Sequence, residues 1–155
     1  MASTTLFFNN MWRLFISLHL ITWRFNYLKI TIMKINCAIV DDNIESVEIL
    51  KSHVAKVPYL NLIGGYTNAV EAMKGFREHS IDLLFMGIRM QQLSGLELAK
   101  LLPKKTRIVF VTAFSEYAID GYKSGGFDYL LKPVNYQNFQ ACVERVRNYM
   151  RDVDE

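Results

Sequence analysis

Short apolar runs alternate with amphipathic segments from residue 35 almost to the end of the chain. In the segment after the first run, Ile44, Val47, Leu50 and Val54 recur at steps of three or four, which is the spacing of one face of a helix. The later segments follow a similar rhythm. The five apolar runs cover residues 35–40, 60–66, 81–86, 108–111 and 127–131. We therefore expect five strands, each followed by a helix.

The amphipathic segments also carry residues at which helices typically begin and end. Side chains that cap helices precede several of them, and proline or glycine closes others. Along the chain these signals are Asn43, Asn68 with Glu71, Ser94-Gly95 with Pro103, Gly125-Gly126 after a segment through Tyr117, Ile119 and Tyr122, and Asn135 before a stripe of Phe139, Val143, Val146 and Met150. Strict alternation of strands and helices predicts a doubly wound α/β fold, with a parallel sheet between two helical layers.

Polar residues gather where the predicted strands end. The first strand stops at Asp41-Asp42, the third at Gly87, the fourth at Thr112 and the fifth at Lys132. Ligands of such sheets bind outside the carboxyl ends of the strands. Two carboxylates, a hydroxyl and an ammonium group are therefore expected at one edge.

Residues 1–32 differ from the rest of the chain, because they are rich in aromatic side chains and contain no acid. The uncharged run between Arg13 and Arg24 has ten residues, whereas a membrane-spanning helix needs about 20. Three interpretations compete: an interfacial anchor, a poorly packed appendage, or an over-long gene prediction whose natural start is Met33. We prefer the third, and divide the chain into an extension at 1–32 and a domain at 33–150. A membrane role is not expected.

Charge and cysteine content narrow the class of protein. The net charge is +3, but four bases and no acid lie in residues 1–40, so residues 41–155 hold 14 bases and 15 acids. Such a balance gives no reason to expect direct nucleic-acid binding. Cys37 and Cys142 lie in apolar stretches and are expected to be buried, reduced thiols of a cytoplasmic protein. The three histidines lack metal-ligand spacing, and we assign them no role.

Three motifs resemble the signature of bacterial response-regulator receiver domains. They are Ile39-Val40-Asp41-Asp42, Val111-Thr112-Ala113 and Asp128-Tyr129-Leu130-Leu131-Lys132-Pro133. The stretch from Thr112 to Ala118 further resembles receivers that precede LytTR-type DNA-binding domains. The resemblance covers about residues 35–147 and implies a flavodoxin-like (βα)5 fold with strand order 2-1-3-4-5.

The resemblance also implies roles for single residues. Asp41 and Asp42 match the acidic pair that holds Mg²⁺, with the backbone carbonyl of Arg89 as a further oxygen ligand. Thr112 and Lys132 match the hydroxyl and ammonium groups that contact the phosphoryl group, and Tyr129 matches an aromatic switch. The family's partner face is formed by the fourth helix, fifth strand and fifth helix. In or near that face we place Tyr117, Tyr122 and Tyr136.

One position departs from the family pattern. Receivers carry a phosphoacceptor aspartate at the end of the third strand, in a pattern such as Asp-x-x-Met-Pro, but this chain reads Met86-Gly87-Ile88-Arg89-Met90-Gln91. Glycine has no side chain, so no acyl phosphate can form at Gly87. Mg²⁺ binding should also be weaker, because one carboxylate is missing.

The sequence thus predicts a phosphorylation-deficient receiver of a two-component phosphorelay, without enzymatic activity. Its expected partners are a histidine kinase or another signalling protein, with a homodimer through the partner face as a further option. Two alternatives remain open: the input domain of a truncated LytTR-type transcriptional regulator, and a flavodoxin-like protein that binds a small ligand or nucleotide. The absence of a glycine-rich phosphate loop after the first strand argues against nucleotide binding.

Overall fold

The computed structural model describes residues 16–24, 34–117, 123 and 125–153. Internal contacts divide the chain into two units, residues 1–33 and residues 34–155. In the first unit, residues 16–24 form a helix in which the Thr22 hydroxyl donates to the carbonyls of Leu18 and His19. The second unit carries the predicted site.

Five parallel strands form one sheet in the order β2-β1-β3-β4-β5, which confirms the predicted order. The strands are β1 (Ile35–Val40), β2 (Leu60–Tyr66), β3 (Leu83–Gly87), β4 (Arg107–Thr112) and β5 (Asp128–Leu131). Strand β3 begins two residues later than the apolar run suggested. Asp82, just before β3, is still tied to β1, because its side chain accepts a hydrogen bond from the backbone N–H of Asn36.

The helices begin at the predicted caps. Asn43 accepts hydrogen bonds from the N–H groups of Glu45 and Ser46, and Ser94 forms a reciprocal capping box with Glu97. The helices are α2 (Ile44–Val54), α3 (Ala69–Glu78), α4 (Gly95–Leu101) and α6 (Tyr136–Val153), with a 3₁₀ turn η1 at Ser115–Tyr117. The helix predicted through Ile119 and Tyr122 lies outside the described residues.

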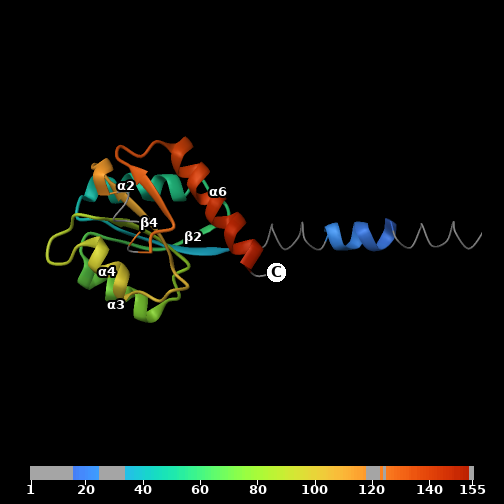
Figure 1. The fold of residues 1–155 in the computed structure, drawn as a ribbon, viewed down its shortest axis with the longest axis horizontal. Coiled ribbons are helices and arrows are strands. Elements are labelled where there is room, and N and C mark those ends of the chain that lie inside the picture. Colours follow the sequence, from blue (N-terminus) through green and yellow to red (C-terminus); the bar gives the residue numbers. More distant parts are fainter. Residues whose placement is uncertain (1–15, 25–33, 118–122, 124, 154–155) are drawn as a thin grey trace, which may run out of the picture. The chain divides into compact units, whose positions relative to one another are not determined.

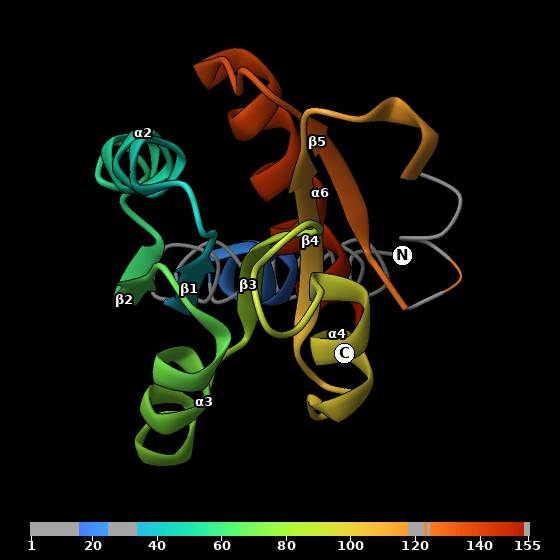
Figure 2. The same ribbon diagram turned by 90° about the vertical axis from the view of Figure 1, so that its left-hand side faces the viewer.

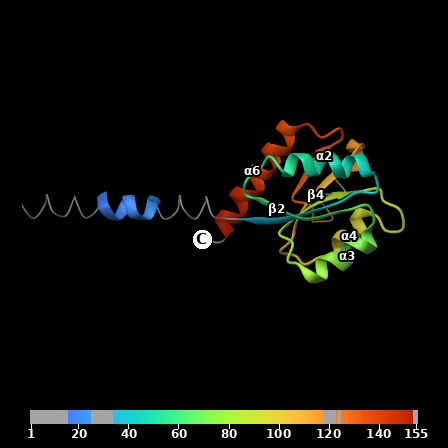
Figure 3. The ribbon, with the colours of Figure 1, turned by 180° about the vertical axis from the view of Figure 1, so that it is seen from behind.

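The sheet separates two helical layers. Helices α2 and α6 cover one face, while α3 and α4 cover the other (Figures 1 and 3). Figure 2 shows the same layers above and below the sheet, with its strands in order from β2 to β5. Along β3 the side chains alternate: Phe85 contacts Phe139 of α6, whereas Leu84 and Met86 belong to the core cluster that also contains Leu98 of α4. Strands buried on both faces explain the continuous apolar runs in the sequence.

Among the described residues, no helix combines the length and the apolar character needed to span a bilayer.

Candidate pocket at the carboxyl edge of the sheet

Asp41 is the buried acidic group of this edge. It directly follows β1, and its backbone N–H still donates to the carbonyl of Tyr66 at the end of β2, 3.0 Å away. Its side chain is 1% exposed. The Oδ1 atom accepts a hydrogen bond of 2.9 Å from the N–H of Asn43. Asp42, the second carboxylate of the predicted pair, is exposed.

Lys132 supplies the opposite charge. It follows β5, and its N–H donates to the Thr112 carbonyl over 2.8 Å, which fixes where its side chain starts. The ammonium Nζ lies 2.6 Å from Oδ2 of Asp41, and the lysine side chain is 24% exposed. The peptide bond between Lys132 and Pro133 is cis. The structure therefore brings together two of the predicted site residues, one at each side of the edge.

Gly87 lies beneath this ion pair at the end of β3. A Cβ atom added to Gly87 would stand 2.9 Å from Oδ2 and 3.2 Å from Cγ of Asp41. Real Cβ atoms almost never come so close to another heavy atom, so any side chain at this position requires the Asp41 carboxylate to move. The carboxylate thus occupies space next to the backbone that only glycine leaves open.

Thr112 and Tyr129 occupy the neighbouring strand ends. Thr112 is 3% exposed, and its hydroxyl oxygen accepts a hydrogen bond from the N–H of Phe114, as a cap of the following turn would. The Tyr129 hydroxyl donates to the carbonyl of Phe114. Burial, with a smaller contribution from the charge of Glu116, raises the pKa of Tyr129, so the hydroxyl keeps its proton at neutral pH. The guanidinium carbon of Arg89 lies 4.2 Å from the centre of the Phe114 ring. These contacts link the loops after β3 and β4 to β5.

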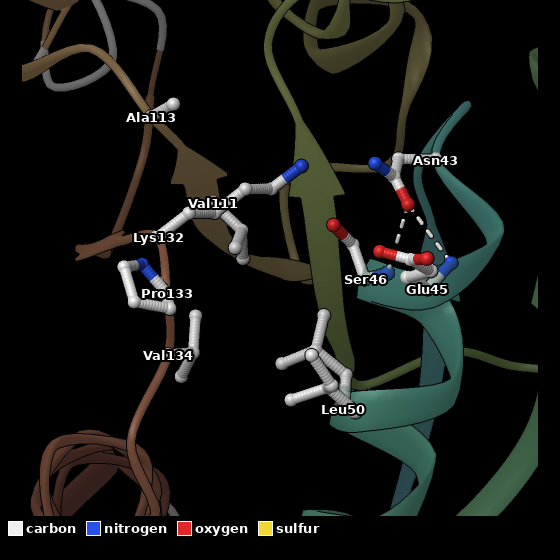
Figure 4. Close-up of a pocket in the computed structure, with 10 residues that line it drawn as sticks. Asn43, Glu45, Ser46, Leu50, Val111, Ala113, Lys132, Pro133 and Val134 are labelled. Carbon is white, nitrogen blue, oxygen red and sulfur yellow. Dashed lines mark hydrogen bonds between the residues drawn. The ribbon is translucent and has the colours of Figure 1, made fainter.

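A cleft of about 280 Å³ lies beside Lys132, between the first turns of α2 and the turn after β5 (Figure 4). Its lining is mostly apolar, and the Lys132 side chain reaches from the end of β5 toward the start of α2. The lining residues are Asn43, Glu45, Ser46, Ile49, Leu50, Val111, Ala113, Lys132, Pro133 and Val134.

His53 is a residue of this region to which sequence reasoning assigned no role. It lies on α2, is 8% exposed, and its Nε2 atom is 2.9 Å from the carbonyl oxygen of Val134, two residues after Lys132. Its Nδ1 atom is buried without a hydrogen-bond partner. Nothing in the local sequence around His53 indicates that its side chain will contact a turn 81 residues away.

Of the three tyrosines predicted in or near a partner face, Tyr136 has side-chain contacts that the structure describes. The ring of Tyr136 packs against α2, with its centre 5.5 Å from that of His53, and Lys56 stands over it at 5.0 Å. Tyr136 is the first residue of α6, so its side chain meets the helix next to it. Tyr117 is the last residue of η1, and Tyr122 lies outside the described residues.

The described acidic side chains do not by themselves make up a set of metal ligands. Mg²⁺ prefers an octahedron of oxygen ligands. Within the described parts of the chain, no three His, Cys, Asp or Glu side chains come close enough to share an ion. Of the predicted pair, Asp42 is exposed, and Oδ2 of Asp41 already contacts an ammonium group.

Comparison with known proteins identifies a matching family and several relatives. A family model described as the response regulator receiver domain matches residues 37–144. An uncharacterized response regulatory protein of Shewanella oneidensis is 37% identical over 115 residues, which cover 73% of this chain and 49% of the relative. Transcriptional regulatory protein BtsR of Escherichia coli K12 is 36% identical over 115 residues, covering 73% and 48%. The chain thus spans about half the length of the curated relatives it matches.

Solved structures show the same architecture. The response regulator domain of Thermotoga maritima CheB superposes with a TM-score of 0.65 at 26% identity, covering 74% of this chain and 95% of that one. The receiver domain of AraT, a response regulator of Geobacillus stearothermophilus, superposes with a TM-score of 0.69 at 23% identity, covering 79% and 100%.

Proposed function

Because the chain belongs to the response regulator receiver family, we propose that it is a phosphorylation-deficient receiver that signals through contacts with other proteins. The observation that carries this proposal is Gly87 at the end of β3, beneath the ion pair of Asp41 and Lys132. In the family pattern this is the place of the aspartate that accepts the phosphoryl group. A glycine offers no nucleophile, so the phosphorelay chemistry cannot take place there.

Other groups near Gly87 do not replace the missing nucleophile. Asp41 is buried and held by Lys132 and the Asn43 N–H, so its carboxylate is not free to attack a phosphodonor. Asp82 precedes β3 and lies at the opposite end of the strand, about 16 Å away. We therefore assign the domain no catalytic activity of its own.

Its partners are then a histidine kinase or another signalling protein that recognises the receiver fold. A receiver acts by populating one of two conformations that a partner distinguishes. The hydrogen bond from Tyr129 to the Phe114 carbonyl and the stacking of Arg89 on Phe114 favour one arrangement of the loops beside β5. Self-association through β5 and α6 is a second way to read out that arrangement.

The test compares the 155-residue chain with Gly87→Asp and Gly87→Asn. Each protein is incubated with Mg²⁺ and a small-molecule phosphodonor, and its intact mass is recorded. Gly87→Asn is the matched control, because its side chain has the size of aspartate but cannot form an acyl phosphate. We expect a phosphoryl group on Gly87→Asp alone. A phosphoryl group on the wild-type chain would refute the proposal and reveal another acceptor.

A second candidate function follows from one relative. BtsR is named a transcriptional regulatory protein, and this chain matches about half of its length. As part of a longer regulator of the LytTR type, the same domain would control a DNA-binding partner domain. Sequencing the reading frame downstream of residue 155 tests this candidate: an in-frame LytTR-type domain supports it, and an unrelated sequence rejects it.

A further inference from the structure

We propose that Lys132 is the built-in cation of this pocket, so that the folded domain needs no Mg²⁺ beside Asp41. The inference concerns the same site as the proposed function and deepens it. Its structural part stands on the ion pair alone, and its consequence for signalling rests on the proposed function.

The Asp41 carboxylate needs a nearby positive charge. Asp41 is 1% exposed, and a buried carboxylate is costly unless an opposite charge and hydrogen bonds compensate for its lost hydration. Here Oδ1 accepts a hydrogen bond from the N–H of Asn43, and Oδ2 lies 2.6 Å from the Lys132 ammonium nitrogen. The contact to Oδ2 is an ion pair without the alignment of a hydrogen bond, and this buried oxygen has no hydrogen-bond partner among the described residues. The ammonium therefore provides the positive charge that the buried oxygen requires.

The Asp41–Lys132 ion pair spans most of the width of the sheet. Strands β3 and β4 lie between β1 and β5 in the sheet, so the ion pair joins strand ends that are three strand spacings, or about 14 Å, apart. To meet, the two side chains must cross over the end of β3. Gly87 leaves that path open, because a side chain there would enter the space that Oδ2 of Asp41 now occupies. The loss of a side chain at Gly87 and the pairing of Lys132 with Asp41 are thus two parts of one arrangement.

Mg²⁺ and the Lys132 ammonium group would compete for the same carboxylate oxygen. A metal ion bound to Oδ2 of Asp41 and the Lys132 ammonium at 2.6 Å would occupy the same space with like charge. An acceptor carboxylate would give Lys132 another partner, but Gly87 offers none. The ammonium is attached to the chain and always present, whereas Mg²⁺ binding costs it much of its hydration shell. We infer that the lysine wins this competition and holds the pocket in a single state.

The experiment measures thermal unfolding of the full chain with and without millimolar MgCl₂, at constant ionic strength. The variants are Lys132→Met, which removes the charge but keeps the aliphatic stem, Asp41→Asn with Lys132→Met, and Gly87→Asp. Lys74→Met is the matched control, since Lys74 is also ion-paired, at 3.0 Å to Glu71, but on the surface.

The wild type and Lys74→Met should unfold at a midpoint that Mg²⁺ leaves unchanged. Lys132→Met should unfold about 10 °C lower, because it leaves a buried carboxylate unpaired. Adding Asn at position 41 should restore most of that loss. Mg²⁺ should raise the midpoints of Lys132→Met and Gly87→Asp, in which Asp41 is released from the lysine.

A Mg²⁺-dependent rise of the wild-type midpoint would overturn the inference. So would a double variant no more stable than Lys132→Met. If Lys132→Met does not fold without Mg²⁺, the other two proteins still decide the question. The inference requires that Mg²⁺ raises the unfolding midpoint of Gly87→Asp and leaves that of the wild type unchanged. These outcomes are independent of phosphoryl transfer, which the mass measurement above decides separately.

Discussion

At the scale of single residues, Gly87 acts through its neighbours. A glycine in a strand usually weakens it, since there is no side chain to pack. Here the backbone of Gly87 pairs with Val111 of β4, and the space above it is filled by the Asp41 carboxylate. The hydrogen of Gly87 therefore leaves no void, because the carboxylate of Asp41, the residue after β1, lies where a side chain would start.

Cys37 and Cys142 lend themselves to a prediction at the same scale. Burial raises the pKa of Cys37 to about 12, and burial, followed by the nearby charge of Asp128, raises that of Cys142. The reactive thiolate of Cys37 is then roughly one part in 10⁵ at pH 7. We expect both thiols of the native protein to resist a thiol-specific reagent at neutral pH and both to react after unfolding in guanidinium chloride, as counted by intact mass.

The raised pKa values of the cysteines also make the stability of the fold depend on pH. The ordinary value of a cysteine is 9.0, and the folded-state value of Cys37 is higher, so stability from its neutral form is present below pH 9 and is lost as the pH rises toward 12. Rapid labelling of the native protein at neutral pH, at the rate of a free thiol, would show instead that the core around β1 and α6 opens.

At the scale of elements, the contact between α2 and the turn after β5 gives the next prediction. His53→Leu removes the donor to the Val134 carbonyl and leaves a buried acceptor unpaired, which should lower the free energy of unfolding by about 1–3 kcal/mol. His53→Gln can place its amide nitrogen where Nε2 lies and should lose less. Denaturant unfolding of both variants measures the difference, and equal losses would show that the ring contacts with Tyr136 and Phe139, not the hydrogen bond, matter.

The elements themselves could largely be predicted from the sequence, because their signals are local. Asn43, Asn68 and Ser94 cap the helices as expected, and alternation alone indicates the parallel sheet. The candidate site could be predicted only in part. Its residues lie at the expected edge, but which partner Lys132 takes depends on a contact across 91 positions and on the space left by Gly87.

Long-range packing also accounts for contacts that the sequence does not predict. His53 received no role, and the resemblance to the family places Tyr136 in or near a partner face, which stays a prediction. Their rings meet because α2 and α6 cover the same face of the sheet, a neighbourhood that neither local pattern records. Residues whose roles depend on which helices become neighbours are therefore the ones that sequence reasoning misses.

At the scale of the whole molecule, the sheet isolates the two helical layers from each other. Val143 of α6 and Ile108, a β4 residue of the core cluster on the α3 and α4 side, are 0% and 4% exposed. Val143→Ala should lower the free energy of unfolding by about 2 kcal/mol and Ile108→Val by about 1 kcal/mol. Because the two sites share no helical layer, the losses should add to within about 0.5 kcal/mol in the double variant.

Denaturant unfolding of the wild type, the two single variants and the double variant measures this additivity as a double-mutant cycle. Additive losses mean that a change in one helical layer is not felt in the other through the core. A signal would then have to pass through the strand ends, where the ion pair of Asp41 and Lys132 connects β1 to β5. A coupling well above 0.5 kcal/mol would instead mean that the strands transmit strain between the layers. In that case a partner bound to either helical layer could influence the pocket without contacting its edge.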